Sequence, residues 1–277
     1  MMNLEDNLFQ QLVSWFHNRN EKVIVALSGG VDSAVVAMAA KKALDKNAIA
    51  VTADYNTLSA EELTSARRVA KEIDIEHKII RYNELDNTEF VKNDQLRCYH
   101  CRTELATYLS NEARQMDVNL IVDGTNTDDL SDYRPGIKAL RENGIKSPLV
   151  ELGINKQDVR NIAKSNKLSV YDKPSNSCLA SRIPHGMPVT LEKLKRIETA
   201  ELLIKSIFKV RQVRVRDHQD FARIEVGKEE IKDMFDLEKI SVIDSRLKDL
   251  GFKHIALDLS GYKNRENFNN LSSNNTL

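Results

Sequence analysis

The stretch Val23–Ala40, VIVALSGGVDSAVVAMAA, begins with the pattern of a buried strand and ends with that of an Ala-rich helix. Between them lies the short polar loop Ser28–Ser33, SGGVDS. A glycine-containing loop between a strand and a helix is typical of phosphate binding, because the backbone approaches the anion closely and the helix N-terminus offers free N–H groups. No lysine follows the glycines, so the loop lacks the residue that a P-loop ATPase places on the terminal phosphates.

The side chains of this loop add two features. Ser28 and Ser33 carry hydroxyl groups that can donate hydrogen bonds to a phosphate. Asp32 is unexpected beside an anion, because its carboxylate repels phosphate unless a Mg²⁺ ion lies between them. The alternative is an ordinary glycine turn with no ligand.

Strand and helix patterns alternate on both sides of the loop. The sequence predicts strands at 22–27, 48–54, 77–82 and 119–124, and helices at 4–18, 33–44, 59–73, 98–115 and 156–166. Continuous apolar strands are typical of parallel strands that are covered on both faces. Ligands of such sheets bind at the carboxyl ends of the strands, where the loop lies. The fold class predicted for residues 1–186 is α/β, with a doubly wound parallel sheet.

The pattern changes near residue 187. A helix is predicted over 190–207, and two segments, VRQVRVRDH and ARIEV, then alternate like antiparallel strands. We therefore expect a small α+β domain at 187–262, which binds substrate or forms an oligomer contact. The remaining residues, 263–277, are polar and Asn-rich, and we expect a disordered tail.

Composition narrows the classes of function. The chain has 41 Lys+Arg and 41 Asp+Glu residues, and this zero net charge argues against a nucleic-acid partner. No apolar run is long enough to cross a membrane, and the N-terminus lacks the features of a signal peptide, so we expect a cytoplasmic protein. Three cysteines in such a chain indicate metal binding or reactive thiols rather than disulfides.

The loop Ser28–Ser33 in its strand–loop–helix context resembles the PP-loop of the ATP pyrophosphatases, whose fold is adenine nucleotide alpha hydrolase-like. NAD and GMP synthetases belong to that superfamily. The resemblance implies that ATP is cleaved between its α- and β-phosphates, that the loop holds the leaving pyrophosphate, and that AMP is transferred to a substrate oxygen. It would also place Thr52, in VTADYNT, near the adenine base.

The cysteines are Cys98 and Cys101, one helical turn apart, and the distant Cys178. Their spacing places the first two on one helix face. Three possibilities remain open: a 4Fe–4S cluster held by three cysteines with one iron left for another ligand, a zinc site completed by a histidine such as His100, or three unrelated thiols. Several thiolation enzymes of the PP-loop superfamily carry such clusters, which favours the first.

A closer resemblance rests on DGTNTDDLSDYRPG, CLASRIPHG, VRVRDHQDFARIEV and GFKHIALDLSGYK. Together with the loop they resemble the LarE family, sulfurtransferases of nickel-pincer nucleotide biosynthesis. The family adenylates a carboxylate of pyridinium-3,5-biscarboxylic acid mononucleotide and converts it to a thiocarboxylate. In one branch a single cysteine, at the position of Cys178, gives up its own sulfur; another branch has three cysteines and is cluster-dependent. This chain matches the second branch, and the family implies a homo-oligomer, a hexamer.

The resemblance also implies roles for individual residues. Those expected to bind ATP are Ser28, Gly29, Gly30, Asp32, Ser33, Thr52, Gly124, Thr125 and Asn126. Those expected to contact Mg²⁺ are Asp32 and Asp128. Those expected to bind the small-molecule nucleotide substrate are Ser181, Arg182, Glu201, Arg214, Arg216 and Asp233, with Glu198 as the alternative to Glu201. The catalytic and cluster-binding residues would be Cys98, Cys101 and Cys178.

Two other functions remain open. A tRNA 2-thiolation enzyme would use the same loop and cluster on a macromolecular substrate, and its tRNA binding would be sensitive to salt. A nucleotide-sensing protein would bind ATP without turnover, and release of AMP and pyrophosphate would exclude it.

Overall fold

The computed structural model describes residues 4–130 and 134–262, and the chain divides into two compact units, Met1–Asn176 and Ser177–Leu277. The division falls earlier in the chain than the predicted boundary between residues 186 and 187. The segment CLASRIPHG therefore belongs to the second unit. The tail predicted to be disordered, 263–277, lies outside the described residues.

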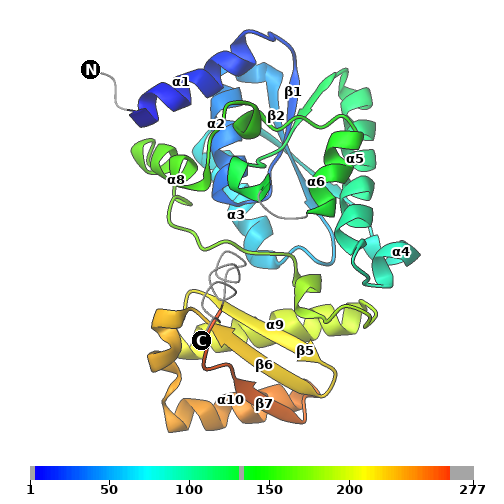
Figure 1. The fold of residues 1–277 in the computed structure, drawn as a ribbon, viewed down its shortest axis with the longest axis vertical. Helices are drawn as coiled ribbons and strands as arrows, with labels where there is room; N and C mark the ends of the chain where they lie inside the picture. The colour runs from blue at the N-terminus through cyan, green and yellow to red at the C-terminus, as the bar shows by residue number, and fades with distance from the viewer. Residues whose placement is uncertain (1–3, 131–133, 263–277) are drawn as a thin grey trace, which may run out of the picture. The chain divides into compact units, whose positions relative to one another are not determined.

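The first unit is built on a parallel sheet (Figure 1). Its strands are β1 (Val23–Ala26), β2 (Ala48–Asp54), β3 (Glu76–Arg81) and β4 (Leu120–Val122). Their order is β3-β2-β1-β4, and every neighbouring pair is parallel. The chain thus winds outward from β1 in both directions, which confirms the predicted doubly wound sheet.

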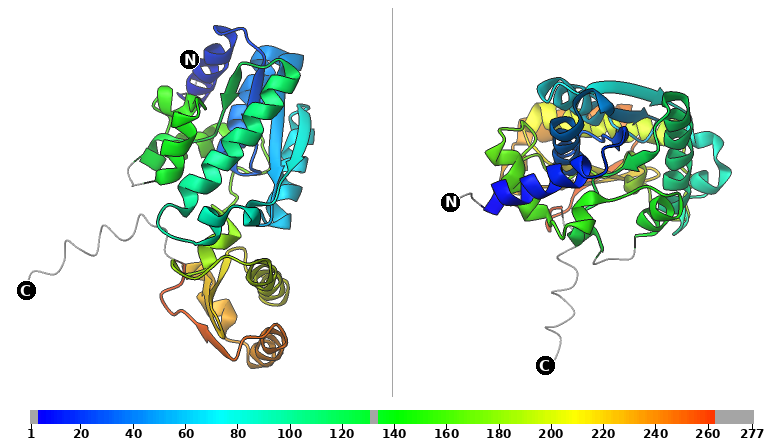
Figure 2. Two further views of the ribbon diagram at one scale, coloured as in Figure 1. Left: turned by 90° about the vertical axis from the view of Figure 1, so that its right-hand side faces the viewer. Right: turned by 90° about the horizontal axis from the view of Figure 1, so that it is seen from above.

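Helices cover both faces of this sheet (Figure 2). They are α1 (Leu4–His17), α2 (Val31–Leu44), α3 (Ala60–Glu72), α4 (Thr88–Val91), α5 (Arg97–Met116), α6 (Pro135–Glu142), α7 (Pro148–Glu151) and α8 (Lys156–Ser165). Side chains alternate between the two faces of a strand. Val23 and Val25 of β1 pack with α1, α2 and α8, whereas Ile24 packs with α5 on the opposite face.

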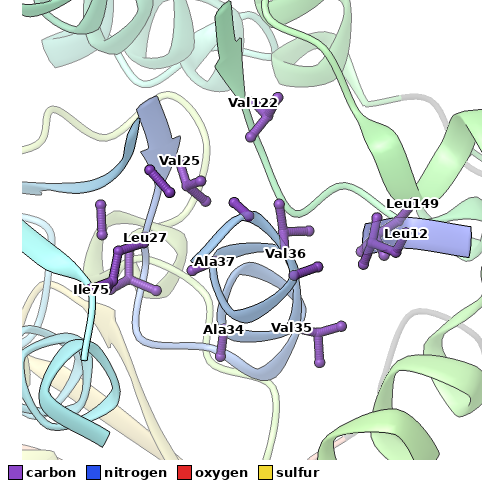
Figure 3. Packing of buried hydrophobic residues seen from close by; sticks show 14 of the residues in the cluster. Leu12, Val25, Leu27, Ala34, Val35, Val36, Ala37, Ile75, Val122 and Leu149 are labelled. Atoms are coloured by element: carbon purple, nitrogen blue, oxygen red, sulfur yellow. The ribbon is translucent and has the colours of Figure 1, made fainter. Parts of the chain in front are cut away.

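Helix α2 lies in the centre of one of these layers (Figure 3). Ala34, Val35, Val36 and Ala37 are fully buried, with Leu27 and Ile75 on one side of the helix and Leu12 and Leu149 on the other. Small side chains let the neighbouring helices and strands approach closely, and tight packing leaves the helix little freedom to move. The first turn of α2, which follows the loop Ser28–Ser33, is therefore held firmly in place.

The second unit contains a three-stranded sheet and two long helices. Its elements are α9 (Leu191–Phe208), β5 (Val213–His218), β6 (Phe221–Val226), α10 (Leu237–Asp249) and β7 (His254–Leu257). Strands β5 and β6 are antiparallel, as predicted, and β7 lies parallel to β6.

The two faces of this second sheet differ in character. Val213, Val215 and Ile224 pack under α9 and α10 in an apolar core. Because neighbouring residues of a strand point to opposite faces, Arg214 and Arg216 lie on the other face. One sheet face thus stabilises the unit, and the other presents charged groups.

Across the described residues, no helix is both long enough and apolar enough to cross a membrane.

Candidate active site

The loop Ser28–Ser33 joins the carboxyl end of β1 to the first turn of α2. Gly30 is the N-cap of α2, and no side chain caps this helix end. The Ser28 and Ser33 hydroxyl oxygens lie 3.1 Å apart, and the Gly30 N–H donates to Ser28 Oγ at 3.4 Å. Two hydroxyl groups and uncapped helix N–H groups are therefore gathered at one place, as the sequence predicted for an anion site.

Gly29 explains why the loop needs glycine. Its φ is +78°, a region that other L-residues rarely adopt. A Cβ atom at this position would lie 2.4 Å from the Glu62 carbonyl oxygen and 2.9 Å from the Ala66 nitrogen, both in α3. No side chain fits between the loop and the helix behind it.

The segment Asp123–Asn126, which follows β4, lies against the start of α2. A Cβ at Gly124 would meet the Ser33 nitrogen at 2.6 Å, so only glycine permits this approach. The Asp123 carboxylate accepts hydrogen bonds from the backbone N–H and the hydroxyl of Thr125 and, at 2.7 Å, from Ser147 Oγ. The structure thus brings together the two segments that the resemblance assigned to the nucleotide, and their assignment to ATP remains a prediction.

Asp32 is held by two partners from distant parts of the chain. Asn126, which is buried, donates its Nδ2–H to Asp32 Oδ1 at 3.1 Å. Lys156, the first residue of α8, forms an ion pair with Asp32 Oδ2 through its ammonium group. The backbone N–H of Lys156 donates to Asp128 Oδ2 at 3.0 Å. One lysine therefore links the two carboxylates that the resemblance assigns to Mg²⁺.

The Asp32 and Asp128 carboxylates fit a Mg²⁺ site only if substrate phosphates supply further ligands. Among residues 4–130 and 134–262, no three His, Cys, Asp or Glu side chains are grouped closely enough to hold a metal ion. Mg²⁺ usually takes one or two carboxylates together with substrate phosphates. Asp32, at the loop and oriented by Asn126, fits the role of such a single ligand, whereas Asp128 is engaged with the N-terminal backbone of α8.

Thr52 lies inside the sheet, with 1% of its surface exposed. Its hydroxyl donates to the Leu27 carbonyl at 2.7 Å and lies 2.8 Å from His77 Nε2. Because the single hydroxyl proton points to Leu27, His77 Nε2 must carry a proton and donate to Thr52. The Thr52 side chain is thus used within the sheet, and its place near adenine remains a prediction.

The cysteines lie in different units. Cys98, exposed, and Cys101, half-buried, occupy the first two turns of α5, and Arg97 Nη2 lies 3.9 Å from Cys98 Sγ. Cys178, half-buried, lies in the second unit at the start of the 3₁₀ turn Leu179–Arg182. None of these three cysteines forms a disulfide bond. Cys98 and Cys101, on one helix face, fit two of the thiolate ligands that an iron–sulfur cluster requires.

Arg182 organises the part of the second unit around Cys178. Its guanidinium is fully buried and forms a two-pronged ion pair with Glu201 of α9, at 2.8 and 3.1 Å. It also donates to the Cys178 carbonyl at 2.9 Å and to Ser181 Oγ at 3.1 Å. Glu201 in turn accepts from the Val215 N–H of β5 at 3.0 Å. The buried position of Glu201 fits the predicted site better than that of Glu198, which lies one turn earlier.

Arg216 and Arg214 share the charged face of β5 but differ in environment. Arg216 forms an ion pair with Glu225 of β6 and donates to the Ser181 carbonyl, both at 2.8 Å. Arg214 lies over the Tyr262 ring, 5.2 Å from its centroid. Burial, together with the nearby charge of Arg182, lowers the pKa of Arg214 to about 10. The Arg214 guanidinium therefore carries a charge that an incoming anion would stabilise.

Asp233 is not part of this cluster. It is exposed, in the 3₁₀ segment Lys228–Met234, and none of the described hydrogen bonds or ion pairs joins it to the arginines. Its assignment to the substrate remains a prediction without structural support. Ser181, Arg182, Glu201 and Arg216, in contrast, form one connected network.

Sequence reasoning missed several residues that complete these sites. Two lysines contact the phosphate loop, Ser28–Ser33: Lys156 lies 124 residues after its partner Asp32, and Lys173 lies 144 residues after its partner Gly29. Glu225 pairs with Arg216. No local motif marks either lysine. The sequence does contain an N-cap residue, Asn155, at the start of α8, and this helix start supplies Lys156 to the loop.

The chain is similar to known proteins over part or most of its length. The NAD synthase family matches residues 3–115. An uncharacterized protein of Synechocystis sp. is 40% identical over 248 residues, covering 90% of this chain and 92% of that protein. The pyridinium-3,5-bisthiocarboxylic acid mononucleotide synthase of Lactiplantibacillus plantarum is 31% identical over 244 residues, covering 88% of this chain and 87% of that protein. A glutamine-hydrolysing GMP synthase of Thermotoga petrophila is 33% identical over 109 residues, 38% of this chain and 22% of that protein.

Proposed function

We propose that this chain, which belongs to the family of the pyridinium-3,5-bisthiocarboxylic acid mononucleotide synthases, the LarE family, is an ATP-dependent, AMP-forming sulfurtransferase. Its substrate would be the carboxylate of a pyridinium mononucleotide, and its product the thiocarboxylate used in nickel-pincer nucleotide biosynthesis. The observation that carries the proposal is the site formed by Ser28–Ser33, Asp123–Asn126 and Lys156 at the carboxyl end of the parallel sheet.

The reaction divides into two transfers. A carboxylate oxygen of the substrate attacks the α-phosphorus of ATP, the bond to the bridging oxygen breaks, and pyrophosphate leaves. A sulfide then attacks the acyl carbon of the adenylate, and AMP leaves with the electron pair of the C–O bond. The first step separates negative charge onto pyrophosphate, which the N–H groups of α2 and the hydroxyls of Ser28 and Ser33 would stabilise.

Lys156 supplies the positive charge that the loop itself lacks. Its ammonium is paired with the Asp32 carboxylate, and both side chains retain about a quarter of their exposure, 26% and 22%. A partly exposed ion pair exchanges partners at low cost. Asp32 would hold the Mg²⁺ that accompanies the nucleotide, and Lys156 would then be left to pair with the phosphates. This role is part of the proposal.

The second unit would bind the substrate phosphate through its arginines. We assign the leading contact to Arg214, whose buried guanidinium lies on the charged face of β5. The lowered pKa of Arg214 supports this assignment, because an anion would offset the effects of burial and of Arg182. Arg182 would instead position the Cys178–Ser181 segment.

We further propose that Cys98, Cys101 and Cys178 hold a 4Fe–4S cluster, as in the three-cysteine branch that the sequence resembles. Such a cluster would deliver the sulfide, so the protein would survive each turnover. The chain itself contributes three cysteines, two of them on one helix face, with the Arg97 guanidinium beside Cys98. Sacrificial transfer from Cys178 is the competing outcome. A homo-oligomer, a hexamer by resemblance, belongs to the same proposal.

The test is anaerobic purification followed by iron and sulfide analysis and an assay for AMP and pyrophosphate. Each of Cys98→Ala, Cys101→Ala and Cys178→Ala should lose the brown absorbance together with sulfur transfer. Full sulfur transfer by Cys98→Ala would contradict the cluster. Release of AMP only in the presence of tRNA would contradict the small-molecule substrate. The absence of any AMP release would contradict the enzyme and favour a protein that binds ATP without turnover.

A further inference from the structure

The back of the phosphate loop is held by charged side chains that the proposed reaction does not use. The Gly29 carbonyl oxygen accepts hydrogen bonds from Lys173 Nζ and from Ser65 Oγ, each at 2.9 Å. Lys173 Nζ also lies 2.8 Å from Glu62 Oε2, and Asn176 Nδ2 donates to Glu62 Oε1 at 3.0 Å. Both Glu62 and Ser65 belong to α3 and are buried.

This arrangement fixes the direction of one peptide group. In a trans peptide the C=O of one residue and the N–H of the next point in opposite directions, and the described residues contain no cis peptide. Anchoring the Gly29 C=O toward α3 therefore turns the Gly30 N–H away from α3. That N–H points at Ser28 Oγ, which is paired with Ser33 Oγ on the side where the anion is expected.

The anchor is needed because glycine supplies no restraint of its own. Gly29 and Gly30 adopt both signs of φ readily, so the peptide between them can flip when no partner holds it. A flipped peptide would present a carbonyl oxygen, not an N–H, to the pyrophosphate. The tight contact of Gly29 with Glu62 and Ala66 limits the movement of the loop but gives no hydrogen bond to select one orientation.

We propose that Lys173, oriented by Glu62, is a positioning residue that locks the Gly29–Gly30 peptide with its N–H facing the pyrophosphate. Lys173 acts through the loop backbone and does not touch the phosphates. Its charge is balanced by Glu62, with the two side chains only 22% and 11% exposed. Lys156 and Lys173 thus have opposite positions at the same loop: the first faces the ligand side, and the second lies behind it. The inference rests on the proposed binding of ATP at this loop.

The test compares ligands that need the loop with one that does not. Isothermal titration of the full chain with Mg²⁺-pyrophosphate, with Mg²⁺-ATP and with AMP is carried out for the wild type, Lys173→Met, Glu62→Gln and Ser65→Ala. We expect Lys173→Met to weaken pyrophosphate and ATP binding roughly tenfold or more, because a hydrogen bond from a charged group is lost, while AMP binding changes little. Ser65→Ala, which removes a neutral donor, should weaken the binding of pyrophosphate and ATP about threefold.

Glu62→Gln separates the two possible roles of the lysine. If Lys173 positions the loop, loss of the Glu62 charge loosens Lys173 and weakens pyrophosphate binding. If Lys173 were itself a phosphate ligand, Glu62→Gln would release its ammonium and strengthen binding, and this result would overturn the proposal. Lys173→Arg should recover part of the affinity, since it retains a cationic donor.

Two controls keep the outcome clear. Lys164→Met removes an exposed lysine from the same unit and should leave all three affinities unchanged. Thermal unfolding of each variant shows whether it folds, and Ser65→Ala and Lys173→Arg remain informative if Lys173→Met does not. If the wild type binds neither ATP nor pyrophosphate, the proposed function fails. If the wild type binds both and folded Lys173→Met binds them equally well, the positioning role fails.

Discussion

The phosphate loop of the first unit and the arginine network of the second, the two sites that we propose bind anions, differ in the groups that they offer. The loop relies on backbone N–H groups and hydroxyls, and its charged neighbours, Asp32 and Lys156, form a partly exposed pair. The second site relies on guanidinium groups, and its central pair, Arg182 with Glu201, is buried. A partly exposed pair can exchange its partners when a ligand arrives, whereas a buried pair is part of the framework.

The comparison separates residues that contact a ligand from residues that hold the structure around the ligand in place. Asp32, Lys156 and Arg214 should affect ligands more than folding. Arg182, Glu201 and Lys173 should act through the structure around the ligand. The predictions below test this separation, starting with the largest expected effect.

Asp32→Ala should abolish pyrophosphate release while the fold remains intact. The carboxylate is the proposed ligand of Mg²⁺ at the loop, and the Asp32–Lys156 pair contributes at most about 1 kcal/mol to stability. Pyrophosphate release and the urea unfolding curve are measured on the same preparation. Adenylation at the wild-type rate would remove the basis for assigning Asp32 to Mg²⁺.

Arg182→Met should destabilise the second unit by about 3–5 kcal/mol, because it leaves the Glu201 carboxylate buried without its partner. The matched variant Lys156→Met, at the partly exposed pair, should cost about 1 kcal/mol or less. Free energies of unfolding from urea titration give both values. Equal costs for the two variants would break the distinction between the two regions.

Arg214→Ala should weaken substrate binding and spare ATP binding. Loss of a charged hydrogen bond to phosphate costs about 1.5–3 kcal/mol, roughly tenfold to a hundredfold or more in affinity. Arg216→Ala should also weaken the substrate but by less, since its guanidinium is engaged with Glu225 and the Ser181 carbonyl. A fall in ATP affinity with unchanged substrate affinity would show that the two sites have been interchanged.

The smallest expected effect is that of His77 on the pH dependence of stability. Burial lowers the pKa of His77, so the folded protein favours the neutral ring that donates to Thr52. The stabilisation is present above the unfolded pKa of about 6.5 and is lost as the pH falls through the lower folded pKa. The difference in stability between the wild type and His77→Gln should therefore shrink from pH 8 to pH 5. A constant difference would mean that His77 does not titrate differently in the folded state.

The sequence predicted the parts of the molecule that are encoded locally. The strands, the doubly wound sheet and the loop Ser28–Ser33 follow from apolar runs and from glycine spacing, and the structure confirms them. The capping box of Asn155 with Asp158 was also predictable, because it depends on residues three positions apart.

The sequence did not show which charges meet. Lys156 and Lys173 look like ordinary helix and loop lysines, and only the tertiary fold brings them to the loop. The pairing of Arg216 with Glu225 requires the register of β5 and β6, which alternation alone does not fix. The division at Asn176 lies earlier than the change in hydrophobic pattern, and Ser181 and Arg182 indeed bond to Arg216 and Glu201, later in the chain.

The central claim is that the chain activates a carboxylate with ATP and transfers sulfur repeatedly. The most direct measurement is anaerobic incubation of the intact protein with Mg²⁺-ATP, sulfide and the pyridinium mononucleotide, followed by mass spectrometry of the products and of the chain. The account predicts AMP and thiocarboxylate in equal amounts, several per chain, with the protein mass unchanged. Product that stops at one per chain, with loss of H₂S from Cys178, would contradict catalytic transfer, and thiocarboxylate without AMP would contradict adenylation.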